Sequence, residues 1–306
     1  MSLESYLKEI AEDSKELVIS RLAKLSAITP GDLDLLKNQW PDIAVERRRE
    51  IVGHLITLAE GDPQYDFNDI FMLGIGDDDE TVRLRSIEGL WEYDDRSLID
   101  PLIDILRSDS SEQVRAGAAV SLGKFALLYE LGNLREKDGD RVEKSLIAAI
   151  RNDKETIEVR RRAVEAIAPL NLPVVTDIIG EAYKNADAFM KASALYAMGI
   201  NCDPAWQPIL IHELNNTDPE IRFEAVKACG EFEDAHALPQ LLKLLNDPDT
   251  QVKVSVISAL GKIGGDEAEA VLEECLKNPE DYIRDAANDA LRELYFNRDP
   301  FSIDSL

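Results

Sequence analysis

Few side chains in this sequence have the types and spacing that catalysis or metal binding requires. The three histidines, His54, His212 and His236, lie far apart. No HExxH motif occurs, the spacing at which two helical histidines bind zinc. Only His212 is directly followed by a glutamate, Glu213, and the run DDDE at 77–80 lacks the twelve-residue spacing of a calcium loop. The sequence therefore predicts no metal site.

Other catalytic arrangements are equally absent from the sequence. The glycines of LGIGDDDE and GKIGGDE do not follow a predicted strand, as a phosphate-binding loop would require. No Ser/His/Asp or Cys/His arrangement can be argued from spacing. The cysteines Cys202, Cys229 and Cys275 are odd in number, widely spaced and without a CxxC motif, which indicates free thiols in a reducing compartment. We therefore predict a protein that is not an enzyme and holds no cofactor.

The charge of the chain limits its partners. The 306 residues include 60 acidic and 34 basic ones, a net charge of −26. Such a field repels nucleic-acid phosphates over about 8 Å at physiological salt, and the basic runs ERRRE (46–50) and VRRRA (159–163) are expected to be solvated. Neither a signal peptide nor an apolar run of 18 residues occurs. We predict a cytoplasmic protein that binds neither nucleic acid nor membrane.

A repeated segment must supply any function that the chain has. An apolar residue followed by a basic one recurs at steps of 31 or 32 residues, with one longer step of 45. A fixed period of this length is typical of stacked repeats. These anchor pairs are Val82-Arg83, Val114-Arg115, Val159-Arg160, Met190-Lys191, Ile221-Arg222, Val252-Lys253 and Ile283-Arg284, with a weaker copy at Glu46-Arg47.

Each anchor begins a helix whose buried stripe is narrow. Positions four, seven and eight after the anchor share its helical face and carry mostly small residues, such as Ala225 and Ala228, so neighbouring helices can approach closely. A glycine often stands nine residues after the anchor, near the expected helix end. N-cap residues are expected three residues before the anchor. They are Asp79, Ser111, Thr156, Asp187, Asp218 and Asp249.

A second amphipathic helix precedes each of these, as in residues 97–107, 205–216, 236–246 and 267–278. The repeat is therefore two helices joined by a turn, and about eight repeats over residues 31–296 would form one continuous all-α solenoid. Residues 1–30 are expected to be an N-terminal helical cap and residues 297–306 a flexible tail. The longer step places an insertion near residues 127–142, with an extended helix followed by the polar loop GNLREKDGD.

The segments DPEIRFEAVKACG (218–230) and DPDTQVKVSVISALG (247–261) resemble the short HEAT-like repeats of the phycobilisome-lyase type. The resemblance implies an α-solenoid whose second helices line a concave face. It also implies that the basic residue after each anchor bonds an acidic residue of the neighbouring repeat. That ladder would contain Arg83, Arg115, Arg160, Arg222 and Arg284.

The exposed face of the second helices carries the functional prediction. Two residues after the anchor, where an inert surface would be polar, the side chains are mostly apolar, with Arg161 and Asp285 as exceptions. A repeated apolar stripe suggests a contact surface, although packing between helices is the other interpretation. The position six residues after the anchor adds Val120 and Tyr196. The predicted partner-binding residues are therefore Leu84, Val120, Tyr196, Phe223 and Val254.

Two functions remain open from the sequence. The first is a non-enzymatic scaffold that binds a protein or peptide on the concave face, and the acidic surface favours a basic partner. The alternative, implied only by the resemblance, is a tetrapyrrole (bilin) lyase subunit or chromophore chaperone. The inserted segment at 127–142 and the N-terminal helix are further candidates for the binding element.

Overall fold

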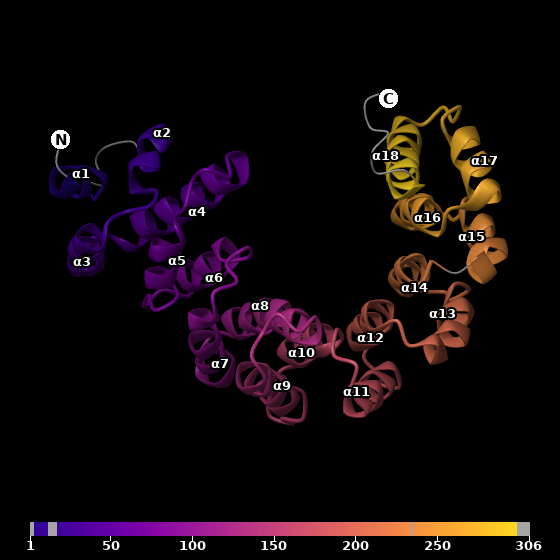
Figure 1. Ribbon diagram of the computed structural model, residues 1–306, viewed down its shortest axis with the longest axis horizontal. Helices are drawn as coiled ribbons and strands as arrows, with labels where there is room; N and C mark the ends of the chain where they lie inside the picture. Colours follow the sequence, from indigo (N-terminus) through magenta and orange to yellow (C-terminus); the bar gives the residue numbers. More distant parts are fainter. Residues whose placement is uncertain (1–2, 12–16, 234, 299–306) are drawn as a thin grey trace. The chain divides into compact units, whose positions relative to one another are not determined.

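The computed structural model describes residues 3–11, 17–233 and 235–298. All regular secondary structure within these residues is helical (Figure 1). After an N-terminal segment, the helices follow one another in eight pairs, from α3 and α4 to α17 and α18. The predicted all-α fold, an α-solenoid of two-helix repeats, is confirmed.

The first helix of each pair is shorter in most repeats and is often preceded by a single 3-10 turn. The N-terminal segment holds α1 (Leu3–Ile10) and α2 (Ile19–Leu22). The first helices are α3 (Pro30–Gln39), α5 (Asn68–Gly74), α7 (Ile99–Ser108), α9 (Glu136–Ile150), α11 (Pro173–Tyr183), α13 (Gln207–Glu213), α15 (Leu238–Leu244) and α17 (Gly265–Cys275). The second helices are α4 (Val45–Gly61), α6 (Glu80–Gly89), α8 (Glu112–Glu130), α10 (Ile157–Ile167), α12 (Ala188–Asn201), α14 (Pro219–Glu231), α16 (Thr250–Ile263) and α18 (Asp281–Arg298).

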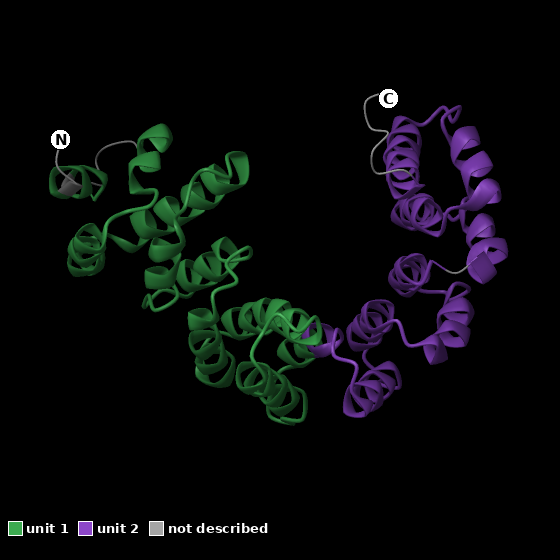
Figure 2. Cartoon of the chain, viewed as in Figure 1, with its two compact units in different colours: residues 1–163 green, residues 164–306 purple. Residues whose placement is uncertain are grey.

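The chain divides into two compact units, residues 1–163 and 164–306, whereas the sequence predicts one continuous array (Figure 2). In a stack each repeat contacts only its neighbours, so few contacts cross any one boundary. In the first unit α4 packs on α6 and α6 on α8. In the second unit α12, α14, α16 and α18 pack on one another in order (Figure 1).

The two ends of the chain can be compared with the predicted boundaries. In the N-terminal segment α1 contacts α3, and α2 contacts α4, which leaves a capping role for residues 1–30 as a prediction. At the other end α18 includes Asn297 and Arg298, so the predicted tail does not begin at 297. The rest of that tail lies outside the described residues.

The small-residue stripe brings the second helices of the 164–306 unit very close together. A Cβ added to Gly199 would lie 2.8 Å from the Cα of Ala228 on the next second helix, below any ordinary contact distance. The same holds between Gly261 and the Ala290 carbonyl oxygen at 2.8 Å, whereas a Cβ on Gly230 would lie 3.1 Å from Ala259, a tight contact. These glycines lie in the last turn of their helices, near the ends as the sequence predicts, but they are helical residues packed against the next helix. They are required for close packing.

Most of the predicted N-caps are confirmed. The carboxylate of Asp218 accepts a hydrogen bond from the backbone amide of Glu220 at 3.0 Å, with Pro219 in the first turn of α14. Asp79, Asp187 and Asp249 cap α6, α12 and α16 in the same way. Ser111 is an exception, because its hydroxyl donates to the Gln113 side chain and caps no backbone amide of α8.

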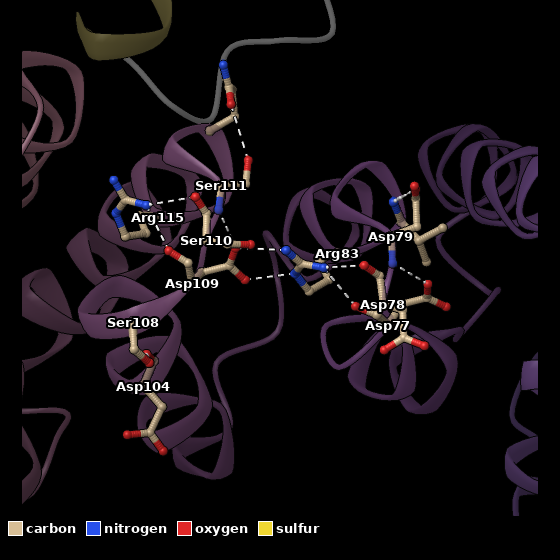
Figure 3. A network of polar contacts seen from close by, with 12 residues as sticks. Asp77, Asp78, Asp79, Arg83, Asp104, Ser108, Asp109, Ser110, Ser111 and Arg115 are labelled. Carbon is tan, nitrogen blue, oxygen red and sulfur yellow. Dashed lines mark hydrogen bonds and ion pairs between the residues drawn. The ribbon is translucent and has the colours of Figure 1, made fainter.

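A ladder of arginines connects consecutive repeats (Figure 3). The guanidinium of Arg83 donates to both carboxylate oxygens of Asp109 in the following repeat, at 2.7 and 2.8 Å. It also donates to the carbonyls of Asp77 and Asp78 in its own loop. Asp109 in turn accepts a hydrogen bond from the amide of Ser111 at 2.8 Å. Each carboxylate of this kind therefore holds its own loop and the preceding repeat together.

The ladder continues with the same geometry in both units. Arg115 forms a bidentate pair with Glu155, at 3.0 and 2.8 Å, and Arg222 one with Asp247, at 2.8 and 2.7 Å. The Asp247 side chain is only 3% exposed. The predicted partner is wrong for two ladder residues: Arg160 donates to the Ile150 carbonyl, and the hydrogen bonds of Arg284 stay within its own repeat.

For Lys191, which stands at the ladder position of its repeat, the acceptor changes. Asn216 stands where other repeats have the ladder aspartate, and the ammonium of Lys191 bonds instead to buried Glu213, at 3.0 Å. The hydroxyl of Tyr183 and the amide of Asn216 also donate to this carboxylate, each at 2.5 Å. Burial alone would raise the pKa of Glu213, but these three donors outweigh it and lower the pKa to about 2.

The first ladder contact corrects the register of the weakest repeat. The sequence suggests Glu46-Arg47 as its anchor, but Arg47 is 5% exposed and occupies the buried anchor position itself. Arg48 then occupies the ladder position and pairs with Asp77 at 2.9 Å. The long stem of an arginine can fill an apolar site while its head reaches a partner, here Glu50 at 2.9 Å, which explains the misassignment.

The inserted segment at 127–142 is mostly helical. The predicted extension of the second helix is confirmed, since α8 runs to Glu130. The predicted loop GNLREKDGD is only partly a loop, because α9 already begins at Glu136. Gly139 explains the difference: a Cβ there would lie 2.2 Å from the ring of Tyr129, so its glycine permits α9 to pack against the extended end of α8.

Candidate functional site

The five predicted partner-binding residues fall into two groups, one in each unit. Leu84 and Val120 lie on α6 and α8 of the first unit and line the same groove. Tyr196, Phe223 and Val254 lie on α12, α14 and α16 of the second unit, and each is half-buried. Whether these residues bind a partner stays a prediction. The first group is described first because an open groove surrounds it.

The groove has a volume of about 830 Å³ and lies on the second helices α4, α6 and α8. Its lining is mainly apolar, with Ile56 from α4 and Ala116 and Gly117 from α8 beside the two predicted residues. Gly117 gives it depth, since a Cβ there would lie 2.9 Å from the Cδ1 atom of Leu84. Val120 remains 53% exposed at its surface.

A tryptophan that the sequence analysis did not single out lies on the same groove. Trp91 follows the end of α6 and is 64% exposed. A signal for it exists in the sequence, because it stands nine residues after its anchor, where four other repeats carry a glycine. A large aromatic residue at the position of close packing cannot be buried between helices, and it is therefore left at the surface.

Lys124 holds the backbone of Trp91 in place. Its ammonium, on α8, donates to the carbonyl oxygens of Leu90 and Trp91 at 3.1 and 3.0 Å, and also to that of Tyr93. These carbonyls follow the C-terminus of α6, where helical acceptors lack partners. Burial lowers the pKa of Lys124 to about 8, and the negative charge of Asp94 partly opposes this shift. The exposed indole is thus carried on a fixed backbone.

The basic side chains of the groove already have partners. Besides Lys124, Arg162 donates to Glu158 at 3.1 Å, and Arg85 lies 3.8 Å from Glu88. Glu60, at the end of α4, is exposed, and no ion pair reaches it within the described part of the chain. The groove therefore combines an apolar floor, an exposed indole and one unpaired carboxylate.

The second group is arranged around a lysine. The ammonium of Lys227 lies 5.4 Å from the ring centroid of Tyr196 and 5.3 Å from that of Phe223, so the structure brings these two predicted residues together. Contacts of this length are cation–π interactions. Glu224, on the same helix, lies 3.8 Å from Lys227, and burial raises the pKa of its carboxylate. The aromatic rings of this group are partly occupied by the protein's own cation.

Comparison with known families agrees with this architecture. The family model for HEAT repeats matches residues 69–136 and 207–292, together about half of the chain. The chain belongs to the HEAT-repeat family. HEAT repeats generally mediate protein interactions. No helix in the described part of this HEAT-repeat chain is both long and apolar enough to cross a membrane.

Several solved structures are similar to this HEAT-repeat chain at low sequence identity. Human deoxyhypusine hydroxylase in complex with glycerol is 19% identical over 87% of this chain and 96% of its own, with a TM-score of 0.37. The complex of CpcE and CpcF of phycocyanin lyase from Nostoc is 18% identical over 64% of this chain and 76% of its own, with a TM-score of 0.47. YIBA_ECOLI is 19% identical over 74% of this chain and 92% of its own, with a TM-score of 0.44. No curated protein sequence matches the chain.

Proposed function

We propose that this HEAT-repeat chain is a non-catalytic scaffold that binds a protein segment in the groove on α4, α6 and α8. The observation that carries the proposal is Trp91, which is 64% exposed beside an apolar floor although its backbone is fixed by Lys124. Tryptophan is the residue type most enriched among the side chains that dominate binding energy at protein interfaces.

Single exposed apolar residues need no explanation, but this groove brings two of them together, Trp91 and Val120, beside the half-buried Leu84. Leu84 on α6, Val120 on α8 and Trp91 just after α6 line one concavity of about 830 Å³. That volume is within the range of about 300–1,000 Å³ typical of binding pockets. A fixed backbone also reduces the entropy that binding must overcome, because the loop is already ordered before the partner arrives.

The second group, at Tyr196, Phe223 and Val254, extends the proposal to a second contact site. Its rings lie on the same kind of helix face as the groove. Lys227 contacts both rings, so a partner there would have to displace or share this cation. We therefore assign the main binding energy to the groove.

The proposal is tested by capturing partners from the native organism with the full chain and with the variant Trp91→Ala. Because Trp91 is largely exposed, its truncation should change the free energy of unfolding by no more than about 0.5 kcal/mol. An aromatic anchor costs about 2 kcal/mol or more of binding, roughly a thirtyfold loss of affinity. The matched control is Phe296→Ala, which removes another aromatic ring, 50% exposed, on α18.

We expect Phe296→Ala to retain the partners of the unmodified chain and Trp91→Ala to lose them. A folded Trp91→Ala protein that recovers the same partners at the same yield would overturn the assignment to this groove. The double variant Tyr196→Ala/Phe223→Ala then tests the second group in the same assay.

A further inference from the structure

We infer that the groove on α4, α6 and α8 accepts a basic amphipathic protein segment. Its apolar side chains would lie on the floor beside Leu84 and Val120. A lysine or arginine side chain would lie against the Trp91 indole and the Glu60 carboxylate. This inference rests on the proposed function and adds the chemical class of the partner.

The charged side chains that line the groove determine whether it favours an acidic or a basic partner. Three cationic side chains line it, and each has a partner: Lys124 bonds to backbone carbonyls, Arg162 to Glu158, and Arg85 forms a weaker, exposed pair with Glu88 at 3.8 Å. The carboxylate of Glu60 has no such partner among the described residues. An acidic segment would have to compete with the existing partners of these cations. A basic segment could pair with the Glu60 carboxylate without displacing any group.

The exposed indole adds a second attraction of the same sign. The face of a tryptophan ring carries negative electrostatic potential and is the best aromatic surface for a cation. The same chain uses this contact elsewhere, where Lys227 lies over Tyr196 and Phe223. No lysine or arginine among the described residues lies over the Trp91 ring. The face of the indole can therefore accept a cationic side chain from a partner.

The field of the whole chain favours the same partner. The net charge of −26 attracts basic segments and speeds their encounter, although it does not by itself fix affinity. Contacts with the apolar floor of the groove are also needed, because they fix the position of the bound segment along the groove. A purely basic peptide should therefore bind weakly and should be released by salt.

The length of the segment follows from helix spacing. Three neighbouring second helices at about 8–10 Å between axes span about 20 Å. A helical segment covers this distance with about 13 residues at about 1.5 Å per residue. Probe peptides of about 14 residues are thus long enough to test the groove.

The test uses three fluorescent peptides with one leucine pattern and with lysine, glutamine or glutamate at all other positions. Their binding to the full chain is measured by fluorescence anisotropy at low and physiological salt. We expect the lysine peptide to bind most tightly. Glu60→Gln should weaken it by up to about fivefold, the effect of one exposed ion pair. Trp91→Leu, which keeps an apolar side chain but removes the ring, should weaken it by about threefold to fivefold.

Two controls separate specific binding from general attraction. Asp266→Asn removes a fully exposed carboxylate on α17 in the other unit and should leave the affinity unchanged. The glutamine peptide should be insensitive to Glu60→Gln. Equal losses with Asp266→Asn and Glu60→Gln, or none with Glu60→Gln and Trp91→Leu, would show that only the net charge attracts the peptide and would overturn the inference.

The outcomes also separate this inference from the proposed function. If the glutamate peptide binds as tightly as the lysine peptide and Trp91→Leu weakens both, the groove binds protein segments but not by charge, and only the inference fails. If none of the peptides binds, the inference fails as well. The partner capture with Trp91→Ala then decides the proposed function independently.

Discussion

Gly199→Ala tests the close packing on which the repeat stack depends. Alanine is favoured over glycine inside a helix by about 1 kcal/mol, so the substitution would normally stabilise the protein. At Gly199 the new methyl group would lie 2.8 Å from the Cα and 3.0 Å from the Cβ of Ala228. Carbon atoms in contact prefer about 3.5–4.0 Å, so α14 would have to move away. Overpacking of this kind costs about 1–3 kcal/mol.

The matched control is Gly53→Ala, in the middle of α4, where an added Cβ meets no atom within 4 Å. Gly53→Ala should therefore be stabilising by about 1 kcal/mol. Relative to this control, Gly199→Ala should be less stable by about 1–3 kcal/mol. The difference removes the contribution of helix propensity, because both glycines lie inside helices.

The assay is urea unfolding followed by the fluorescence of Trp206, which is 6% exposed in the second unit, and Trp40, which is 5% exposed in the first. Because the emission of the three tryptophans overlaps, each reporter is followed in a background in which the other two are replaced by phenylalanine, and each transition is fitted separately because repeat proteins can lose two-state behaviour. Gly199→Ala should shift the Trp206 transition to lower urea, and Gly230→Ala should shift it less, since its shortest contact is 3.1 Å. A Gly199→Ala protein that is stabilised as much as Gly53→Ala would refute the packing argument.

Four further substitutions test the caps and the ladder. Asp218→Ala should destabilise the chain by about 1 kcal/mol in urea unfolding, because it removes an N-cap bond, whereas Ser111→Ala should change little because its hydroxyl caps nothing. Asp247→Ala should cost about 3–5 kcal/mol, since it leaves the buried Arg222 guanidinium unpaired, and a loss below about 1 kcal/mol would contradict the ladder's role. The pKa of Glu213 is about 2 in the folded state against a usual 4.5, so the unfolded chain binds its proton first and stability should fall as pH drops from 4.5 towards 2. Acid titration of Glu213→Gln, compared with the unmodified chain, should show a smaller loss over this interval.

Much of the fold follows from the sequence because its determinants are local or periodic. The N-caps at Asp79 and Asp218 depend on bonds to amides two or three residues away. The helical spacing of the small residues identifies the buried stripe from the sequence alone. The family resemblance implied that Arg83 bonds an acidic residue of the neighbouring repeat, which the structure identifies as Asp109, and the constant repeat length keeps such contacts in register.

The features that the sequence did not predict depend on contacts between repeats or on exceptions to the period. Lys124 fixes the backbone at Trp91 across a separation of 33 residues, and no local pattern announces this contact. Arg47 occupies a position that other repeats fill with an apolar residue, which shifted the register by one. The placement of Leu84 and Val120 on one groove was predictable from their helix faces, but its depth depends on Gly117.

Each ladder carboxylate bonds both an amide of its own loop and the arginine of the preceding repeat. This restricts how such a chain can grow by duplication of a repeat. A repeat that carries both Asp77 and Arg83 is compatible with a copy of itself, because the arginine of the first copy would meet the aspartate of the second. A repeat that carries Asn216 and Arg222 is not, because its duplicated arginine would face a neutral amide. Tandem copies should therefore be tolerated around residues 77–108 and rejected around residues 216–246, so the order of the repeats, as well as their number, is under physical constraint.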